Sequence, residues 1–377
     1  MRKPLQKLLA CILILLLSMP GINSPTATAS STRDETSSII TLAARSYAEK
    51  DIPFKHKGDC ENGPWELNKN SSGTIDAYEW DTYYKNSATT TSYWVGLYKM
   101  KWSKDGKLSY QTINLNSKFS KRIPSGDNIW ATKQDKNSNL FVAYQGAYEG
   151  KADVSMLTVL NKKGTIVKDI VLDDELKHYF SGSSIRIRDI HISGTTIAFL
   201  VREDYDNGSQ LSIQRYNWKT KKRLSTQKLS GLSYVSIIGN YLYGVKSSDA
   251  SNANSNNTGS DSLEYQLLKY SLDGKTVLWS QNLPDGELNI DSAYNKFSYD
   301  TVGNTIYVSN KSGIYSADTS NKNSPFSLVM PATQSKYLSK YYTIVDFRVI
   351  SKDRFYILSI AGEDEEWPTN LAMYTLN

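Results

Sequence analysis

Residues 267–283 read LLKYSLDGKTVLWSQNL, and this stretch decides the fold. It starts with an apolar and aromatic run, reaches the pair Asp273-Gly274, and continues with a second run that closes on Leu283. An Asp-Gly pair favours a two-residue hairpin turn, because both central residues of that turn need positive φ angles. The stretch therefore predicts two antiparallel strands joined by a tight turn.

Copies of this hairpin recur along the chain. Residues 97–115, 156–172 and 213–229 repeat the strand–turn–strand pattern, and residues 314–329 are a looser copy. Residues 371–377, LAMYTLN, match only its first strand. The leucines that close the four full copies lie 54 to 57 residues apart in the sequence: Leu115, Leu172, Leu229 and Leu283.

A second hairpin precedes each copy, which makes a unit of four strands, A to D. Residues 185–192 and 196–202, for example, flank the turn Ser193-Gly194. Four-stranded units with a period near 50 residues are typical of propeller blades. Six units can be counted, so the sequence predicts an all-β fold, a β-propeller of about six four-stranded blades. Seven blades or a β-sandwich remain open as alternatives.

The last unit has strands A, B and C but lacks strand D. An unpaired strand edge invites aggregation, so another segment has to complete this blade. We expect residues 37–54 to supply the missing strand, although Ile39, Ile40, Ala43 and Tyr47 also have the spacing of a short helix. The predicted organisation is a signal peptide at 1–29, a ring-closing N-terminal segment at 30–64 and the propeller at 65–377.

The first residues have the pattern of a secretory signal peptide. Basic residues at positions 2, 3 and 7 precede an apolar run, and Ala27-Thr28-Ala29 fits the small-residue cleavage rule. The apolar run is shorter than the ~20 residues that a membrane-spanning helix needs. We expect cleavage after Ala29, a secreted or cell-surface location, and no transmembrane segment in the mature chain.

Charge and cysteine content narrow the possible partners. The formal net charge of +6 falls to +3 once the three basic residues of the signal peptide are removed, which is low for a protein that binds nucleic acid. Cys60 is then the single cysteine, so no intramolecular disulfide can form. We expect a monomer that is stabilised by its packed core and does not bind nucleic acid.

Residues 270–279, YSLDGKTVLW, resemble the repeat of quinoprotein-like propellers (the PQQ-type repeat). In that repeat a turn precedes a Trp that docks against the next blade. Residues 98–110 resemble the repeat more loosely, with Tyr110 at the position of the Trp. The resemblance implies a propeller. It does not imply a quinone, because no ligand-bearing motif accompanies it, and no cofactor is expected.

Motifs for catalysis and metal binding are sparse. The sequence has no Gly-x-Ser-x-Gly elbow, no phosphate-binding glycine loop and no metal-spaced pair of histidines. Residues 204–208, DYDNG, resemble half of a calcium loop but lack its closing Glu. A hairpin turn is the simpler interpretation of that stretch, and we expect no bound metal.

The connections between strands B and C are predicted to be long and varied, whereas the A–B and C–D turns are short. Since binding residues gather on loops held by a rigid scaffold, we predict a binding site on the B–C side for an extracellular glycan, peptide or protein. The candidate residues are aromatic or acidic: Tyr83, Tyr84, Tyr148, Glu149, Asp204, Tyr205, Asp206, Glu363, Asp364, Glu365, Glu366 and Trp367.

The leading hypothesis is thus an exported, non-enzymatic binding propeller. The alternative is an extracellular hydrolase that acts on carbohydrate with carboxylates at the mouth of the channel. Its candidate carboxylates are Asp189, Asp300 and Asp346, which lie in predicted inner strands. Glycoside chemistry needs two carboxylates at a fixed separation, which the sequence does not supply, so enzymatic activity stays open.

Overall fold

The computed structural model describes residues 46–53, 66–69, 73–86, 91–123, 129–172, 184–206, 208–247, 265–284, 290–291, 296–338, 342–361 and 369–377. All of them belong to one compact unit, Leu42–Asn377. The predicted signal peptide and Cys60 lie outside the described residues. Among the described helices, none is long and apolar enough to cross a membrane.

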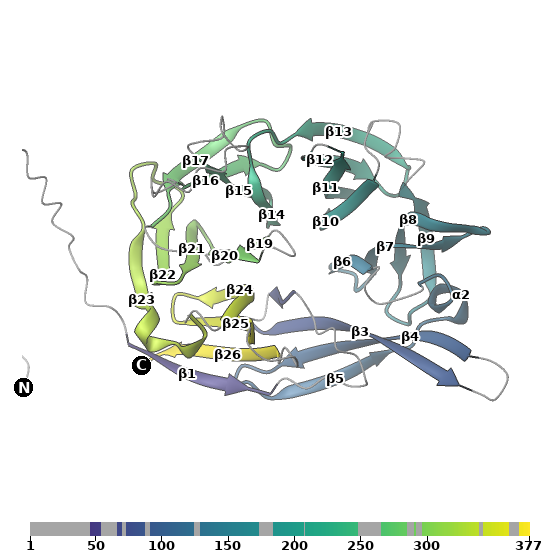
Figure 1. Ribbon diagram of the computed structural model, residues 1–377, viewed down its shortest axis with the longest axis horizontal. Helices are drawn as coiled ribbons and strands as arrows, with labels where there is room; N and C mark the ends of the chain where they lie inside the picture. Colours follow the sequence, from purple (N-terminus) through teal and green to yellow (C-terminus); the bar gives the residue numbers. More distant parts are fainter. Residues whose placement is uncertain are drawn as a thin grey trace, which may run out of the picture. The chain divides into compact units, whose positions relative to one another are not determined.

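The strands form six four-stranded antiparallel sheets arranged as blades around a ring (Figure 1). Blade 1 contains β2 (Asn68–Lys69), β3 (Ile75–Asn86), β4 (Thr91–Trp102) and β5 (Leu108–Ile113). Blade 2 contains β6 (Ile129–Gln134), β7 (Leu140–Tyr148), β8 (Lys151–Leu160) and β9 (Ile166–Val171). Blade 3 contains β10 (Ser184–Ser193), β11 (Thr196–Tyr205), β12 (Gly208–Asn217) and β13 (Lys222–Lys228).

The remaining blades follow the same order, with the first strand of each nearest the centre of the ring. Blade 4 contains β14 (Ser233–Ile238), β15 (Tyr241–Ser247), β16 (Tyr265–Ser271) and β17 (Val277–Asn282). Blade 5 contains β20 (Tyr299–Val302), β21 (Thr305–Asn310), β22 (Gly313–Asp318) and β23 (Ser327–Pro331). The short elements between blades are α2 (Ser117–Ser120), β18 (Ile290–Asp291), β19 (Lys296–Phe297), η3 (Ala332–Gln334) and η4 (Lys336–Leu338).

Blade 6 is closed by the N-terminal part of the chain, as the sequence predicts. It contains β24 (Tyr342–Ser351), β25 (Arg354–Ala361) and β26 (Thr369–Leu376), and β1 (Tyr47–Ile52) pairs antiparallel with β26 as its outer strand. The register runs from Tyr47 opposite Leu376 to Ile52 opposite Leu371. The prediction of six blades with this closure is confirmed, and Tyr47 lies in a strand and not in a helix.

The core lies between the blades, where the faces of neighbouring sheets pack together. Trp279 on β17 is buried, donates its Nε1–H to the carbonyl of Asn321 at 3.3 Å, and meets the ring of Phe326 edge-on at 6.1 Å. Asn321 and Phe326 belong to blade 5. The expected docking of this Trp against the next blade is therefore confirmed.

The B–C connections of blades 1 to 3 differ from the prediction. They are not long loops, because strands B and C themselves are longer, with 12 residues in each of β3 and β4. In blade 2 only Glu149 and Gly150 join β7 to β8, with φ of 50° and 80°. Two positive φ angles define a tight hairpin turn of the primed type, and a Glu-Gly pair is a weak signal for it in sequence.

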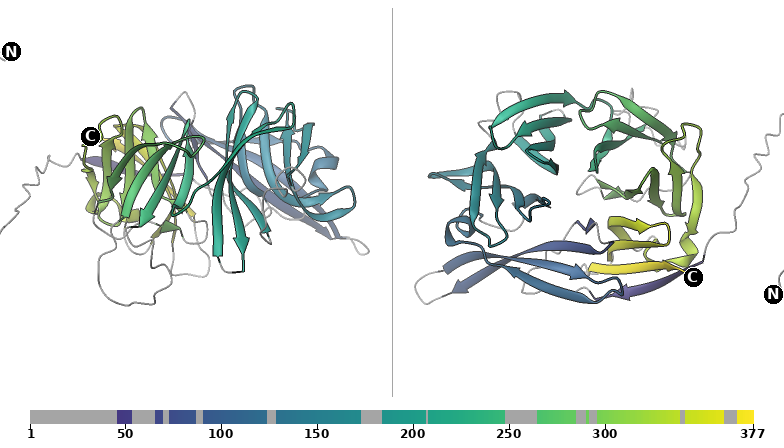
Figure 2. Two further views of the ribbon diagram at one scale, coloured as in Figure 1. Left: turned by 90° about the horizontal axis from the view of Figure 1, so that it is seen from above. Right: turned by 180° about the vertical axis from the view of Figure 1, so that it is seen from behind.

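Figure 2 shows the ring from its edge and from behind.

Candidate functional site

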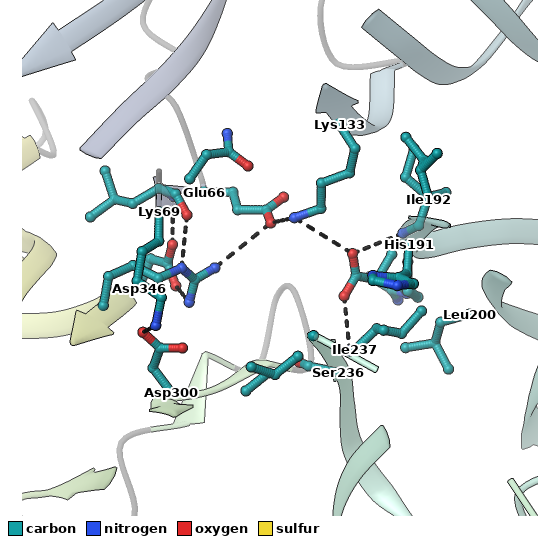
Figure 3. A pocket seen from close by; sticks show the side chains of 18 of the residues that line it. Glu66, Lys69, Lys133, His191, Ile192, Leu200, Ser236, Ile237, Asp300 and Asp346 are labelled. Atoms are coloured by element: carbon teal, nitrogen blue, oxygen red, sulfur yellow. Dashed lines mark hydrogen bonds and ion pairs between the residues drawn. The ribbon is translucent and has the colours of Figure 1, made fainter. Parts of the chain in front are cut away.

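A cavity of about 620 Å³ lies at the centre of the ring, and all six blades contribute to its lining (Figure 3). Its walls come from the inner strands and the residues that flank them, for example Glu66 before β2, Lys133 on β6 and Arg348 on β24. Inner strands are normally the most apolar part of a blade, yet this lining is rich in charge. The arrangement of those charges decides what the cavity can do.

Three aspartates of the lining connect neighbouring blades in the same way. In each, Oδ1 accepts a hydrogen bond from the backbone N–H of the next residue in its own strand. Oδ2 accepts one from a backbone N–H of the following blade: Asp189 from Ile237 at 3.0 Å, Asp300 from Val349 at 2.7 Å, and Asp346 from Leu67 at 2.6 Å. Carboxylates that accept backbone N–H groups in this way are structural bridges.

The other three blade junctions also have polar contacts near the cavity. Lys133 of blade 2 pairs with Glu66 of blade 1 and lies 3.8 Å from Oδ1 of Asp189 in blade 3. Tyr299 of blade 5 donates its hydroxyl to the carbonyls of Tyr234 at 3.2 Å and Tyr243 at 2.9 Å, both in blade 4. Burial raises the pKa of Tyr299, so this hydroxyl keeps its proton and stays a donor.

Lys133 and Arg348 are the central cations of this network. Arg348 contacts Asp346 at 2.7 Å and Glu66 at 3.7 Å, and its Nε donates to the carbonyl of Leu67 at 2.7 Å. Burial alone would lower the pKa of both cations, but the neighbouring carboxylates outweigh it, so both pKa values lie above their ordinary range. Both groups therefore carry their charge at neutral pH.

Every carboxylate among the lining residues has such a partner. Besides the four in the network, Asp76 pairs with Lys99 at 2.9 Å, and Asp135 accepts the amides of its own turn from Asn137 and Asn139. Asp189, Asp300 and Asp346, which the hydrolase hypothesis names, do reach the cavity, but their oxygens hold the blades together. A carboxylate saturated by amides and cations is a poor nucleophile and a poor general acid.

Two described lining residues, Tyr78 on β3 and Arg188 on β10, have a buried side-chain atom without a hydrogen-bond partner. The Nε of Arg188 is buried and, among the described residues, has neither a hydrogen-bond partner nor an ion pair. Arg188 lies at a β-bulge, between Ile187 and Asp189 in the register with β11. The lining therefore contains engaged carboxylates and one cation with an unused donor.

The sequence-predicted binding residues lie elsewhere, at the B–C ends of the blades. Tyr148 is the last residue of β7, its ring lies 5.1 Å from the guanidinium of Arg122, and Arg122 pairs with Asp169 at 2.8 Å. Glu149 follows in the turn and is exposed. Tyr83 and Tyr84 lie on β3, opposite Trp94 and Tyr93 of β4. Neither Tyr148 nor Glu149 is among the residues that line the cavity.

In blade 3, Asp204 is a strand residue that accepts from Nε of Arg202 at 2.6 Å. Tyr205 pairs with Gly208 at the end of the β11–β12 hairpin, and Asp206 is exposed in the turn. The hairpin interpretation of this stretch is thus the correct one. Among the described residues, no group of three or more His, Cys, Asp or Glu could hold a metal. Residues 363–367, with Glu363 to Trp367, lie outside the described residues, and the predicted site as a whole stays a prediction.

Sequence reasoning named three acidic residues of the lining but missed the basic ones. Lys133 and Arg348 were not singled out, although each interrupts a β-strand whose other residues are mostly apolar or β-branched. Arg188 was also not singled out, and it lies on β10, where four isoleucines are interspersed with polar and charged residues. A charged side chain in a strand that the repeat places at the centre of a ring is unusual, because charges are rarely buried without partners. That contrast is the signal that could have found them.

Comparisons with known proteins identify no family. The chain matches no model of a protein family, and no curated protein sequence matches it. The resemblance to quinoprotein-like repeats is therefore not supported at the level of a family. Solved structures that match have 8 to 12% identity in the three cases below.

One is a mutant of the α-L-arabinofuranosidase Arb93A from Fusarium graminearum, with 12% identity and a TM-score of 0.42, covering 82% of this chain and 91% of that one. The β-propeller domain of the Trilobed protease from Pyrococcus furiosus has 8% identity and a TM-score of 0.39, covering 81% and 80%. The N11 neuraminidase-like protein of A/flat-faced bat/Peru/033/2010 has 10% identity and a TM-score of 0.37, covering 89% and 95%. Likenesses this distant carry no argument about ligand or activity.

Proposed function

We propose that this protein is an exported, non-catalytic binding propeller, and that it binds an extracellular glycan, peptide or protein with the extended B–C hairpins of blades 1 to 3. The observation that carries the proposal is that two of these hairpins end in the same way, with a tyrosine before the turn. Tyr148 and Tyr205 are each the last strand B residue to pair before the turn, with Lys151 and Gly208 as partners. An exposed acidic residue follows each tyrosine, Glu149 in one blade and Asp206 in the next.

Support for binding comes from the way these tyrosines are held. Tyr148 is half-buried against the guanidinium of Arg122, which Asp169 fixes in turn. Tyrosine offers a large contact area at a small cost in side-chain entropy, and aromatic residues dominate binding energy at interfaces. A rigid hairpin that presents a tyrosine beside a carboxylate suits sugars and basic peptides.

Support for the absence of catalysis comes from the central cavity. The six carboxylates among the described lining residues are all engaged by amides or cations, as described above. The hydrolase alternative needs one carboxylate free to attack or to protonate, and this lining favours the binding hypothesis over it.

The test starts with the mature protein on glycan and peptide arrays, followed by calorimetry with the best ligand. The double variant Tyr148→Ala/Tyr205→Ala should weaken binding at least tenfold, while Arg122 keeps its partner Asp169. The matched control is Lys162→Ala/Lys222→Ala, which changes two exposed residues at the C–D turns of the same two blades.

If the control variant loses the ligand and the tyrosine variant keeps it, the hairpin side is the wrong surface. If no array ligand binds and the protein instead degrades a carbohydrate polymer, the hydrolase alternative replaces this proposal.

A further inference from the structure

The geometry points to a second site, inside the central cavity: Arg188 and its surroundings at the blade 3–blade 4 junction bind a small organic anion, one with a carboxylate or phosphate group on an apolar or aromatic body. This site is separate from the hairpin ends and does not depend on them. It rests on the cavity, on the unused donor of Arg188, and on the charge and backbone conformation around it.

The first observation is the state of Arg188. Its Nε is removed from solvent, yet it has no hydrogen-bond partner among the described residues, where Lys133 and Arg348 have several. Leaving a buried donor unsatisfied costs ~1–3 kcal/mol, more for a charged group. A buried donor without a partner needs an explanation, and a ligand that accepts a hydrogen bond from this Nε would supply one.

The second observation is the electrostatic setting. Arg186 on β10 lies opposite Arg202 on β11, and Arg186 precedes Arg188 by two residues. Burial, Arg202 and Arg186 together lower the pKa of the Arg188 guanidinium, while Asp204 opposes them more weakly. The Nε of Arg202 is already donated to Asp204 at 2.6 Å. The local excess of positive charge is what an anion would relieve.

The third observation is the strained backbone of Tyr234, which lines the same cavity from blade 4. Its φ of 50° is rare for a residue with a bulky side chain. The conformation is fixed by a register shift between Ser233 and Ser236 and by the hydroxyl of Tyr299, which donates to the Tyr234 carbonyl at 3.2 Å. Strain of this kind gathers at ligand sites, where the surrounding structure imposes it.

These features define the class of ligand. A guanidinium presents a planar fork that fits carboxylate and phosphate groups, often through two parallel hydrogen bonds. Leu200, Leu211 and Val235 add apolar surface to the lining near Arg188 and Tyr234. A volume of about 620 Å³ falls within the range of small-molecule sites. An anion with an apolar or aromatic body would fit the guanidinium, the apolar lining and the volume of the cavity. A bare inorganic anion would fit the guanidinium alone.

The experiment is calorimetric titration of the mature protein with benzoate, phenyl phosphate and inorganic phosphate, in chloride-free buffer at fixed ionic strength. We expect saturable binding of at least one aromatic anion, tighter than inorganic phosphate. Arg188→Gln should weaken it at least tenfold, and Arg188→Lys should have an intermediate effect because it keeps the charge without the fork. The control Arg223→Gln removes the same charge from an exposed position of β13 in the same blade and should bind like the wild type.

A second readout separates a binding role from a structural one. Without ligand, Arg188→Gln should melt at the same temperature as the wild type or higher, because a buried unsatisfied charge is removed. With the best aromatic anion present, only the wild type and the control should gain thermal stability. The proposal is overturned if none of the three probes binds the wild type at millimolar concentration, or if Arg188→Gln binds as tightly as the wild type.

Discussion

The carboxylate of Asp346 accepts a hydrogen bond from the backbone amide of Leu67 at a distance of 2.6 Å, and these two residues belong to the last and the first blade. Arg348, two residues further along β24, donates to the carbonyl of the same Leu67. On the inner side of the ring, side chains of blade 6 are therefore hydrogen-bonded to the backbone of blade 1. At its outer edge, blade 6 is completed by β1.

Asp346→Ala should destabilise the protein by about 3–5 kcal/mol, because it removes the nearer carboxylate partner of the buried Arg348 and leaves Glu66 at 3.7 Å. Two backbone amides, of Leu67 and Phe347, also lose their acceptor. Urea denaturation followed by circular dichroism measures the effect. The control Asp206→Ala removes an exposed carboxylate from a turn and should leave the midpoint unchanged. Equal midpoints for both variants would show that the bridge is dispensable.

Ring closure can be tested with two mature proteins that begin at different residues. A chain that starts at Ser46 should melt like the longer mature form, whereas one that starts at Pro53 lacks β1 and should be severely destabilised. The buried side chains of Tyr47 and Ile52 alone account for about 3–6 kcal/mol. A synthetic peptide of residues 46–53 should restore part of the melting temperature of the shorter chain. If both chains melt alike without peptide, β1 does not stabilise the ring.

Trp279 joins blades 4 and 5 by packing and by one hydrogen bond, and two substitutions separate these contributions. Trp279→Phe keeps a ring against Phe326 but loses the bond to Asn321, so it should cost about 1–2 kcal/mol. Trp279→Ala should cost about 3–5 kcal/mol because it leaves a cavity. The exposed Val277 on the same strand gives the control, Val277→Ala, with a change within ~0.5 kcal/mol. Similar losses for the Phe and Ala variants would mean that the hydrogen bond dominates.

The turn of blade 1 touches the closing strand at Gly106. Its φ is 82°, and a Cβ there would lie 2.6 Å from Cγ2 of Ile52 on β1. Gly194 has a φ of 60° with nothing within 4 Å of a Cβ, so Gly194→Ala shows the backbone cost alone, about 1 kcal/mol. Gly106→Ala should cost clearly more, and Ile52→Ala should remove the excess in a double-mutant cycle of unfolding free energies. Additive effects on the unfolding free energy would mean that the contact between the new Cβ at position 106 and Ile52 does not destabilise the protein.

His191, on the cavity lining, gives a prediction for pH. Burial lowers its pKa, although the hydrogen bond to Asn240 and the charge of Asp189 oppose this. A His with a depressed pKa binds its proton more weakly in the folded than in the unfolded state, so it contributes stability above the unfolded pKa of about 6.5 and loses it as the pH falls. The wild type should lose more stability between pH 7 and pH 5 than His191→Gln, by about 1.4 kcal/mol for each unit of pKa difference. Parallel curves for the two proteins would contradict this.

Much of the fold follows from the sequence because propeller blades repeat their turn chemistry. The Asp-Gly turn at 273–274 and the polar turns at 193–194 and 303–304 fix hairpins whose strands the structure confirms. The missing outer strand of the last blade predicted a partner from the N-terminal part of the chain, and β1 fills that place. The B–C ends of blades 1 to 3 differ from the prediction. In blade 2 the reason is the turn Glu149-Gly150, because a positive φ is not expected for a Glu.

The cavity could not be predicted from the sequence to the same degree. Its network joins residues that lie far apart in the chain, such as Glu66 with Arg348 and Lys69 with Asp300. Local turn signals say nothing about which side chains meet across a ring. The register also shifts in four of the inner strands, β6, β10, β14 and β24, as at Arg188. The side chain that reaches the cavity there depends on a backbone irregularity that periodicity does not reveal.

The pairing of β1 with β26 determines when the ring can close during synthesis of the chain. Ser46 and Asn377, which are 331 residues apart, are joined by a hydrogen bond at the end of that pair. Strand β1 is synthesised first among the described strands but cannot pair until β26 has been synthesised. Blade 6 therefore stays incomplete until residues 369–376 have been made. A chain that stops before these residues is an open ring with a bare edge on blade 6, which invites pairing with other chains.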